Sequence, residues 1–142
     1  MIPPSELEPR LRELIRRALQ ELDLAPDASA GLELVLEPPR NRAHGDLATS
    51  VAMQIGSLSK RPPMELARQL CDRLTRLLRE SNGSPAIERV EPKPPGFINF
   101  FLSRAFLYTV LREALRAGSG YGRSELGKGR RVMVEFVSAN PT

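Results

Sequence analysis

Apolar residues recur at two different periods along the chain, and this alternation limits the fold to a mixture of helices and strands. Spacing of three and four residues is typical of helices, and spacing of two is typical of strands with one buried face. The first pattern predicts helices at 5–22, 46–55, 63–78 and 103–117. The second predicts strands at 32–37 and 97–102, and a weaker strand is expected at 86–91, where the apolar residues do not alternate cleanly. This order predicts an α+β domain of two layers, with a small, mostly antiparallel sheet and helices on one face.

Short polar residues mark the expected helix starts. Ser5 and Glu8 have the spacing of a capping box, in which each side chain bonds the backbone of the other. Pro9 suggests an alternative, a helix that begins with this proline in its first turn. Asp46 is expected to cap the second helix and Ser103 the fourth, because their side chains can accept from free N–H groups.

Composition narrows the possible partners. The chain has 142 residues, of which 41% are hydrophobic and 27% charged, and its net charge is +4 with 21 Lys+Arg against 17 Asp+Glu. This balance is compatible with a polyanionic partner. The single cysteine, Cys71, excludes an internal disulfide framework and is expected in the core. We expect no metal site, because the chain has one cysteine and one histidine. We expect no membrane contact and a cytoplasmic location, because the sequence shows no leader and no apolar run of membrane-spanning length.

The strand predicted at 97–102 (FINFFL) carries the main candidate binding residues. Period two places Ile98, Phe100 and Leu102 on one face and Phe97, Asn99 and Phe101 on the other. If the aliphatic face is buried, the aromatic rings can stack on splayed bases and the amide can bond a base edge. The alternative is that both faces are covered.

Two further segments are distinctive. His44 stands beside Gly45 and Asp46 without a second metal ligand or an evident catalytic partner, so a structural junction is expected there. Residues 118–130 hold five glycines, which favours a flexible connector. The following run, 131–137 (RVMVEFV), is typical of a strand buried on both faces, and we expect it to begin a second domain.

Four segments together resemble one family. The segment "VMVEFVSANPT" resembles the opening strand of the catalytic domain of arginyl-tRNA synthetases, which there leads into the His-x-Gly-His signature. "HGDLATSVAM", "PGFINFFLS" and "YGRSELGKGRRVMVEF" resemble segments of the same family in the same order. Leu47 and Ser50 depart from the family pattern, which usually has an aromatic residue and often has Asn there.

The resemblance implies a domain division and a set of contact residues. Residues 1–118 would form the family's N-terminal tRNA-binding domain, 119–130 a linker, and 131–142 the start of a Rossmann-like class I catalytic domain. Phe97 and Asn99 would contact an unpaired base of the tRNA D-loop. The expected arginine contacts are Glu135, Ser138 and Asn140, and the signature region would begin at Ala139, Asn140, Pro141 and Thr142.

The resemblance also implies an activity. A full-length ligase would use ATP with Mg²⁺ to form arginyl-adenylate and then transfer arginine to its tRNA, as a monomer. These 142 residues contain no expected catalytic residue, so alone they should be inactive and bind no cofactor. Two alternatives are a self-contained RNA-binding module and a protein-interaction domain, of which the latter predicts no salt-dependent RNA binding.

Overall fold

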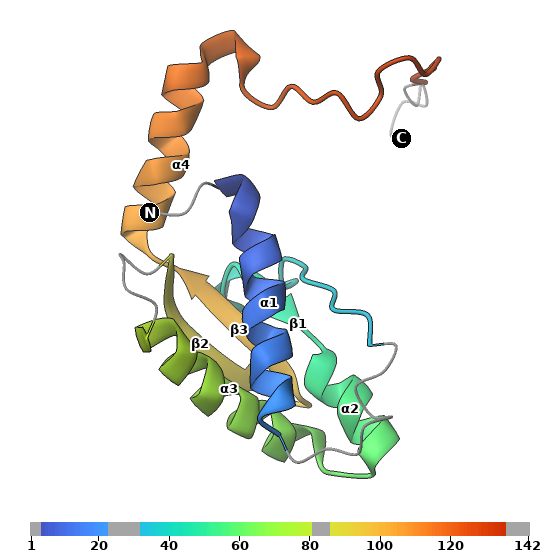
Figure 1. Ribbon diagram of the computed structural model, residues 1–142, viewed down its shortest axis with the longest axis vertical. Coiled ribbons are helices and arrows are strands. Elements are labelled where there is room, and N and C mark those ends of the chain that lie inside the picture. Colours follow the sequence, from blue (N-terminus) through green and yellow to red (C-terminus); the bar gives the residue numbers. More distant parts are fainter. Residues whose placement is uncertain (1–3, 23–31, 81–85, 136–142) are drawn as a thin grey trace, which may run out of the picture.

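A computed structural model describes residues 4–22, 32–80 and 86–135 (Figure 1). Its α-helices in these ranges are α1 (Leu7–Gln20), α2 (Val51–Ser59), α3 (Pro63–Glu80) and α4 (Arg104–Ala117). Its strands are β1 (Leu47–Thr49), β2 (Ile87–Lys93) and β3 (Phe97–Leu102). Short 3₁₀ turns are η1 (Pro4–Glu6), η3 (Arg42–His44) and η4 (Gly118–Gly120). The predicted α+β class is confirmed.

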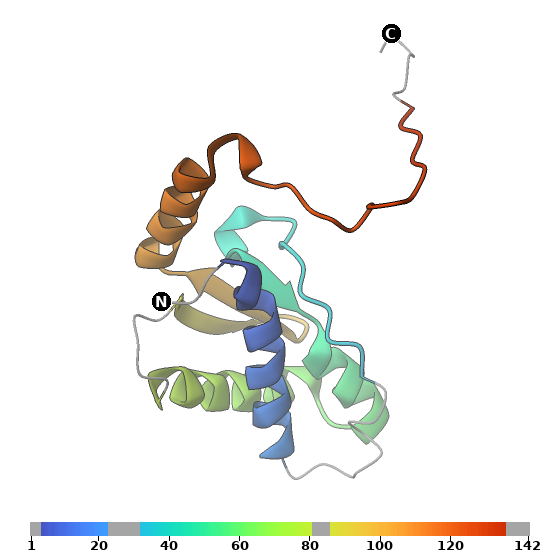
Figure 2. The ribbon, with the colours of Figure 1, turned by 45° about the horizontal axis from the view of Figure 1, so that its top comes forward.

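The three strands form one antiparallel sheet with β3 in the centre, in the order β1-β3-β2. Helices α1, α2 and α3 lie against one face of it (Figures 1 and 2). Ile98 and Phe100 of β3 point into this layer and are fully buried. They belong to one core with Ile55 of α2 and Leu70 of α3. Cys71 also lies in this core, as predicted, and burial raises the pKa of its thiol to about 12.

Helix α1 does not begin with the predicted capping box. The helix starts at Leu7, directly after η1, and no side chain caps its first residue. The box predicted from Ser5 and Glu8 is therefore wrong. Pro9 is the third helical residue, where a backbone N–H would have no partner within the helix. The alternative, with Pro9 in the first turn, is confirmed.

The predicted strand at 32–37 is wrong, although its alternation of buried and exposed residues is present. Leu34 and Leu36 are buried, yet only Glu37 bridges to the sheet, through Ala48. Two backbone carbonyl groups of this segment accept hydrogen bonds from side chains rather than from a neighbouring strand. Arg12 donates to the carbonyl of Leu34, and Gln54 donates to that of Glu33 at 3.2 Å. The backbone N–H of Val35 also donates within the segment, to the carbonyl of Glu33 at 3.0 Å, so the chain turns locally and packs beside the sheet.

Asp46 does not cap α2, which begins later at Val51. Its backbone N–H donates to the carbonyl of Phe100 at 2.9 Å, and its Oδ2 accepts from the N–H of Leu102 at 2.8 Å. The carboxylate therefore continues the backbone ladder beside β3. This pairing draws Leu47 and the residues after it into strand β1 rather than into the helix.

Gly45 permits that pairing. Its φ is +107°, a value that residues with a side chain rarely adopt. A Cβ here would lie 2.7 Å from the backbone oxygen of Phe100. The junction expected around His44 is thus a close approach of backbone to backbone.

Helix α4 is capped as predicted but is largely exposed. Ser103 Oγ accepts from the N–H of Phe106 at 3.1 Å, and Gly118 ends the helix with φ +53°. Phe106 is buried, whereas Leu111 and Leu115 are 54% and 73% exposed. The expected apolar stripe of α4 is therefore not core, because the helix projects away from the sheet (Figure 1).

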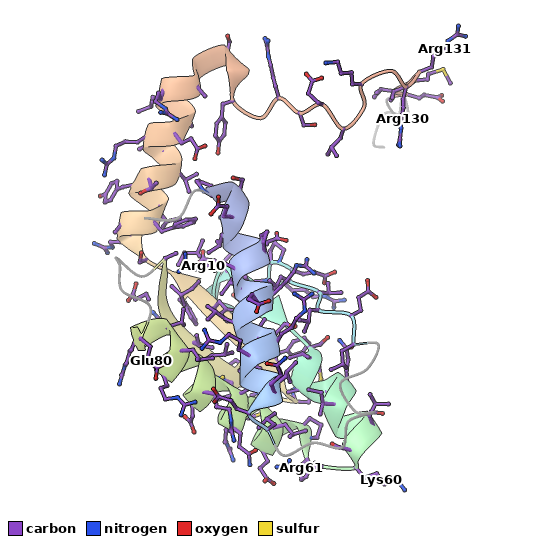
Figure 3. The ribbon with its side chains drawn as sticks, viewed as in Figure 1. Arg10, Lys60, Arg61, Glu80, Arg130 and Arg131 are labelled. Carbon is purple, nitrogen blue, oxygen red and sulfur yellow. The ribbon has the colours of Figure 1, made fainter. Side chains whose placement is uncertain are left out.

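Residues 121–135 form turns and extended chain, and they are exposed. In the described part of the predicted strand, 131–135, Val132 and Met133 are 73% and 90% exposed. A strand buried on both faces needs neighbouring strands, and none of the described residues supplies them here. Figure 3 shows Arg130 and Arg131 well away from the helical layer. Residues 136 and 137 lie outside the described ranges.

We predict that Gly45→Ala destabilises the fold by about 1–3 kcal/mol, the cost of holding a strained backbone. The added methyl group would also meet the oxygen of Phe100. Gly120→Ala is the matched control, since a Cβ there meets nothing within 4 Å, and it should change stability by less than about 0.5 kcal/mol. Urea denaturation measures both. Equal midpoints for the two variants would contradict the close approach at Gly45.

Candidate nucleic-acid interface

The face of the sheet opposite the helices carries three cross-strand pairs from β2 and β3. In the register, Arg89 lies opposite Phe101, Glu91 opposite Asn99, and Lys93 opposite Phe97. Residues between them, such as Phe100, point into the core. Because side chains alternate along a strand, these pairs share the other face.

A hollow of about 670 Å³ opens beside one end of these pairs, and we call it the Asn99 hollow. It is lined by Val35, Glu37, Pro38, Pro39, Arg40, Asn41, His44, Ala48, Ser50, Lys93, Pro94, Phe97 and Asn99. The chain after the bridge at Glu37 forms one side, and β2 and β3 form the other. The predicted residues Phe97 and Asn99 therefore meet in one concave site.

Asn99 is deeply placed in this hollow. The residue is only 2% exposed, and its Oδ1 has no hydrogen-bond partner among the described residues. A buried acceptor left unpaired costs about 1–3 kcal/mol. Thr49 Oγ1 is also unpaired, but Thr49 lies opposite Ile98 and so faces the helices. Of these two residues, Asn99 lines the hollow and Thr49 does not.

The three FINFFL residues of this face have different surroundings. Phe97 is 37% exposed and lines the hollow beside Asn99. Phe101 is half-buried outside it, under the guanidinium of Arg89. The expectation of two aromatic rings flanking an exposed amide is thus only partly met, because the amide is buried.

Charges of both signs surround the hollow. Arg40 and Lys93 line it together with Glu37 and His44. Lys93 Nζ lies 3.4 Å from Glu91, and Arg89 Nε lies 2.8 Å from the same carboxylate. The hydrogen bond from Arg89, followed by that from Lys93, lowers the pKa of Glu91. Glu91 is therefore ionised at neutral pH and compensates part of the positive charge.

A tight turn places the polar residues of the 38–44 segment. Asn41 Oδ1 accepts from the N–H of Ala43 at 2.9 Å, which starts the 3₁₀ turn η3. His44 ends this turn and is exposed. Sequence reasoning missed the proline pair at 38–39 and Arg40 as lining residues. The sequence feature that could have indicated them is the pair Pro38-Pro39, which ends the preceding apolar segment and is followed by Arg40 and Arg42 shortly before His44.

The other predicted site residues are not near the hollow or lie outside the described ranges. Glu135 is exposed on the extended C-terminal chain. Ser138, Ala139, Asn140, Pro141 and Thr142 all lie beyond residue 135, where the described part ends. In the described ranges, no three His, Cys, Asp or Glu side chains gather as a metal site would require. None of the described helices is both long and apolar enough to cross a membrane.

Comparisons with known proteins agree with the sequence resemblance. The family model for the arginyl tRNA synthetase N terminal domain matches residues 9–102. Arginine–tRNA ligase 1 of Halalkalibacterium halodurans is 43% identical over 137 residues, which is 96% of this chain and 23% of that protein. The arginine–tRNA ligases of Oceanobacillus iheyensis and Paracoccus denitrificans are 42% and 41% identical and are covered to 23% and 22%. The chain thus spans less than a quarter of each of these relatives. It belongs to the arginyl-tRNA synthetase N-terminal domain family.

Proposed function

We propose that this chain is the tRNA-contacting N-terminal part of an arginine–tRNA ligase, and that the Asn99 hollow holds an unpaired base of the tRNA D-loop. The observation that carries the proposal is that Asn99, whose Oδ1 is unpaired, lines a concave site beside the exposed ring of Phe97. The family match supports it, because residues 9–102 include every residue that lines the hollow.

The chemistry of the hollow suits a splayed base. The ring of Phe97 offers a stacking surface, and Asn99 Oδ1 can accept from an N–H on a base edge. Binding a base would satisfy an acceptor that is otherwise buried without a partner. Arg40 and Lys93 are placed to attract the adjoining phosphates.

The activity of the whole ligase is part of the same proposal. It would activate arginine with ATP and Mg²⁺ and then esterify the arginine tRNA, in the cytoplasm and as a monomer. The relatives named arginine–tRNA ligase support this assignment. The 142 residues contain neither the His-x-Gly-His nor the Lys-Met-Ser-Lys-Ser motif, so we propose no ATP contact within them and no activity for them alone.

The domain division proposed for such a ligase has the tRNA-binding domain at 1–118, the linker at 119–130 and the start of the catalytic domain at 131–142. Glu135, Ser138 and Asn140 would help to form the arginine pocket. Small polar groups that follow a strand of an α/β sheet are common ligand contacts, which supports this choice.

The hollow predicts the effect of two substitutions on tRNA binding. Phe97→Ala should weaken binding of arginine tRNA by about 5- to 100-fold, the usual loss for a stacking aromatic, and Asn99→Ala by about 10-fold. Fluorescence anisotropy with a labelled tRNA transcript measures both, and affinity should fall as salt rises. Removing one D-loop base should abolish the effect of Asn99→Ala.

Gln69→Ala is the matched control, because this amide lies on α3, on the helical side of the sheet. It should bind like the unchanged protein. If both hollow variants also bind with unchanged affinity, the hollow is not the tRNA contact. If the unchanged protein shows no salt-dependent binding at all, a protein-interaction role is favoured instead.

The arginine pocket is tested separately in a full-length ligase that carries this segment. Asn140→Ala should raise the KM for arginine several-fold, because it removes a proposed polar contact to the amino acid. The KM for tRNA should stay the same, since Asn140 is not assigned to the RNA. An unchanged KM for arginine would remove Asn140 from the pocket.

A further inference from the structure

Arg89 and Phe101 form a stacked pair on the open face of the sheet, outside the Asn99 hollow. The guanidinium carbon of Arg89 lies 3.6 Å from the centroid of the Phe101 ring, which is close enough for a cation–π contact. Arg89 belongs to β2 and Phe101 to β3, and they are direct cross-strand partners. The sheet itself therefore sets this arrangement.

Two carboxylates hold the edges of the guanidinium. Arg89 Nε donates to Glu91 at 2.8 Å, and its Nη1 lies 3.6 Å from Glu88. One face of the guanidinium is on the ring and the edges are paired, yet the side chain is still 48% exposed. The arrangement is a planar group that is fixed in place and partly open to solvent.

We propose that the Arg89–Phe101 pair is a second stacking position, for another unpaired nucleotide of the RNA whose base enters the Asn99 hollow. The inference rests on the proposed function of that hollow. Guanidinium planes, like aromatic rings, are common stacking surfaces for RNA bases. A guanidinium already held flat loses little freedom when a base stacks on it.

The charges around Arg89 favour a base over a phosphate at this position. The carboxylates of Glu88 and Glu91 lie beside the guanidinium and compensate the charges of Arg89 and Lys93. A phosphate would have to approach two carboxylates, which costs energy. Stacking uses the free face of the guanidinium and leaves both ion pairs in place.

The spacing along β3 separates the two positions. Phe101 is four residues from Phe97, which corresponds to about 13 Å along a strand. Stacked neighbouring bases are only about 3.4 Å apart. The two positions therefore take different nucleotides, and the RNA would run along the central strand with its bases unstacked.

The test uses Arg89→Lys, which keeps the charge and removes the plane. Its binding to an arginine tRNA transcript is measured by anisotropy, together with a set of transcripts that each lack one D-loop base. We expect a loss of about five-fold or more for the intact transcript. For one transcript that lacks a D-loop base, Arg89→Lys and the unchanged protein should bind equally well. The missing base in that transcript should differ from the one whose removal abolishes the effect of Asn99→Ala.

Arg16→Lys is the matched control, because Arg16 is exposed on α1 and pairs only loosely with Glu13, at 3.9 Å. Phe101→Leu is a second variant, which removes the ring beneath Arg89. Its loss of affinity should disappear for the same transcript as that of Arg89→Lys. Thermal melting of each variant verifies that it is folded.

Three results would overturn the inference. Arg89→Lys could bind like Arg16→Lys, could lose the same factor on every transcript, or could couple to the same nucleotide as Asn99→Ala. In each case the proposed function still stands if Asn99→Ala couples to a D-loop base. If Asn99→Ala couples to none, the proposed function fails as well.

Discussion

The antiparallel pairing of β3 with both of its neighbours is the constraint on which the rest of the structure depends. One face of β3 places Ile98 and Phe100 in the core, under α2 and α3. The other face places Phe97 and Asn99 in the hollow and Phe101 under Arg89. Because side chains alternate along a strand, a shift of the register by one residue would exchange core and binding residues. The same hydrogen bonds thus hold the fold and the proposed interface.

The unpaired oxygen of Asn99 is best understood as a local cost that the fold tolerates. An apolar side chain at this position would avoid the loss of about 1–3 kcal/mol. The surrounding core, from Leu66 to Leu74 on α3 and across β3, provides the stability that allows such a group to remain unsatisfied. In the proposed function, an RNA base with a matching N–H donor would recover this energy on binding if the amide turns toward the hollow.

Local patterns in the sequence predicted most of the elements. The periods of α1, α3, α4 and β3 were each clear, and the cap at Ser103 was correct, because these features depend on neighbouring residues. Strand β2 was predicted although its apolar residues do not alternate cleanly. The errors arose where distant contacts prevailed. Asp46 looked like a helix cap, but it bonds the backbone of β3, 56 residues away. Residues 32–37 alternate as a strand does, yet side chains of α1 and α2 take up their carbonyls.

The candidate site was predictable in its chemistry and not in its shape. FINFFL and the family resemblance indicated Phe97 and Asn99. No local pattern showed that the chain after Glu37 would turn beside β1 and enclose Asn99, or that Arg89 would lie over Phe101. Both features depend on the register between segments that are distant in sequence.

We propose above all that RNA binds the open face of the sheet. The most direct measurement is an NMR titration of the ¹⁵N-labelled protein with arginine tRNA, following backbone and side-chain amide signals. We expect large shifts for the side-chain amide of Asn99 and for backbone signals of Phe97 and Lys93, with little change in α1 and α3. Shifts concentrated on α1 and α3, with Asn99 unchanged, would contradict it.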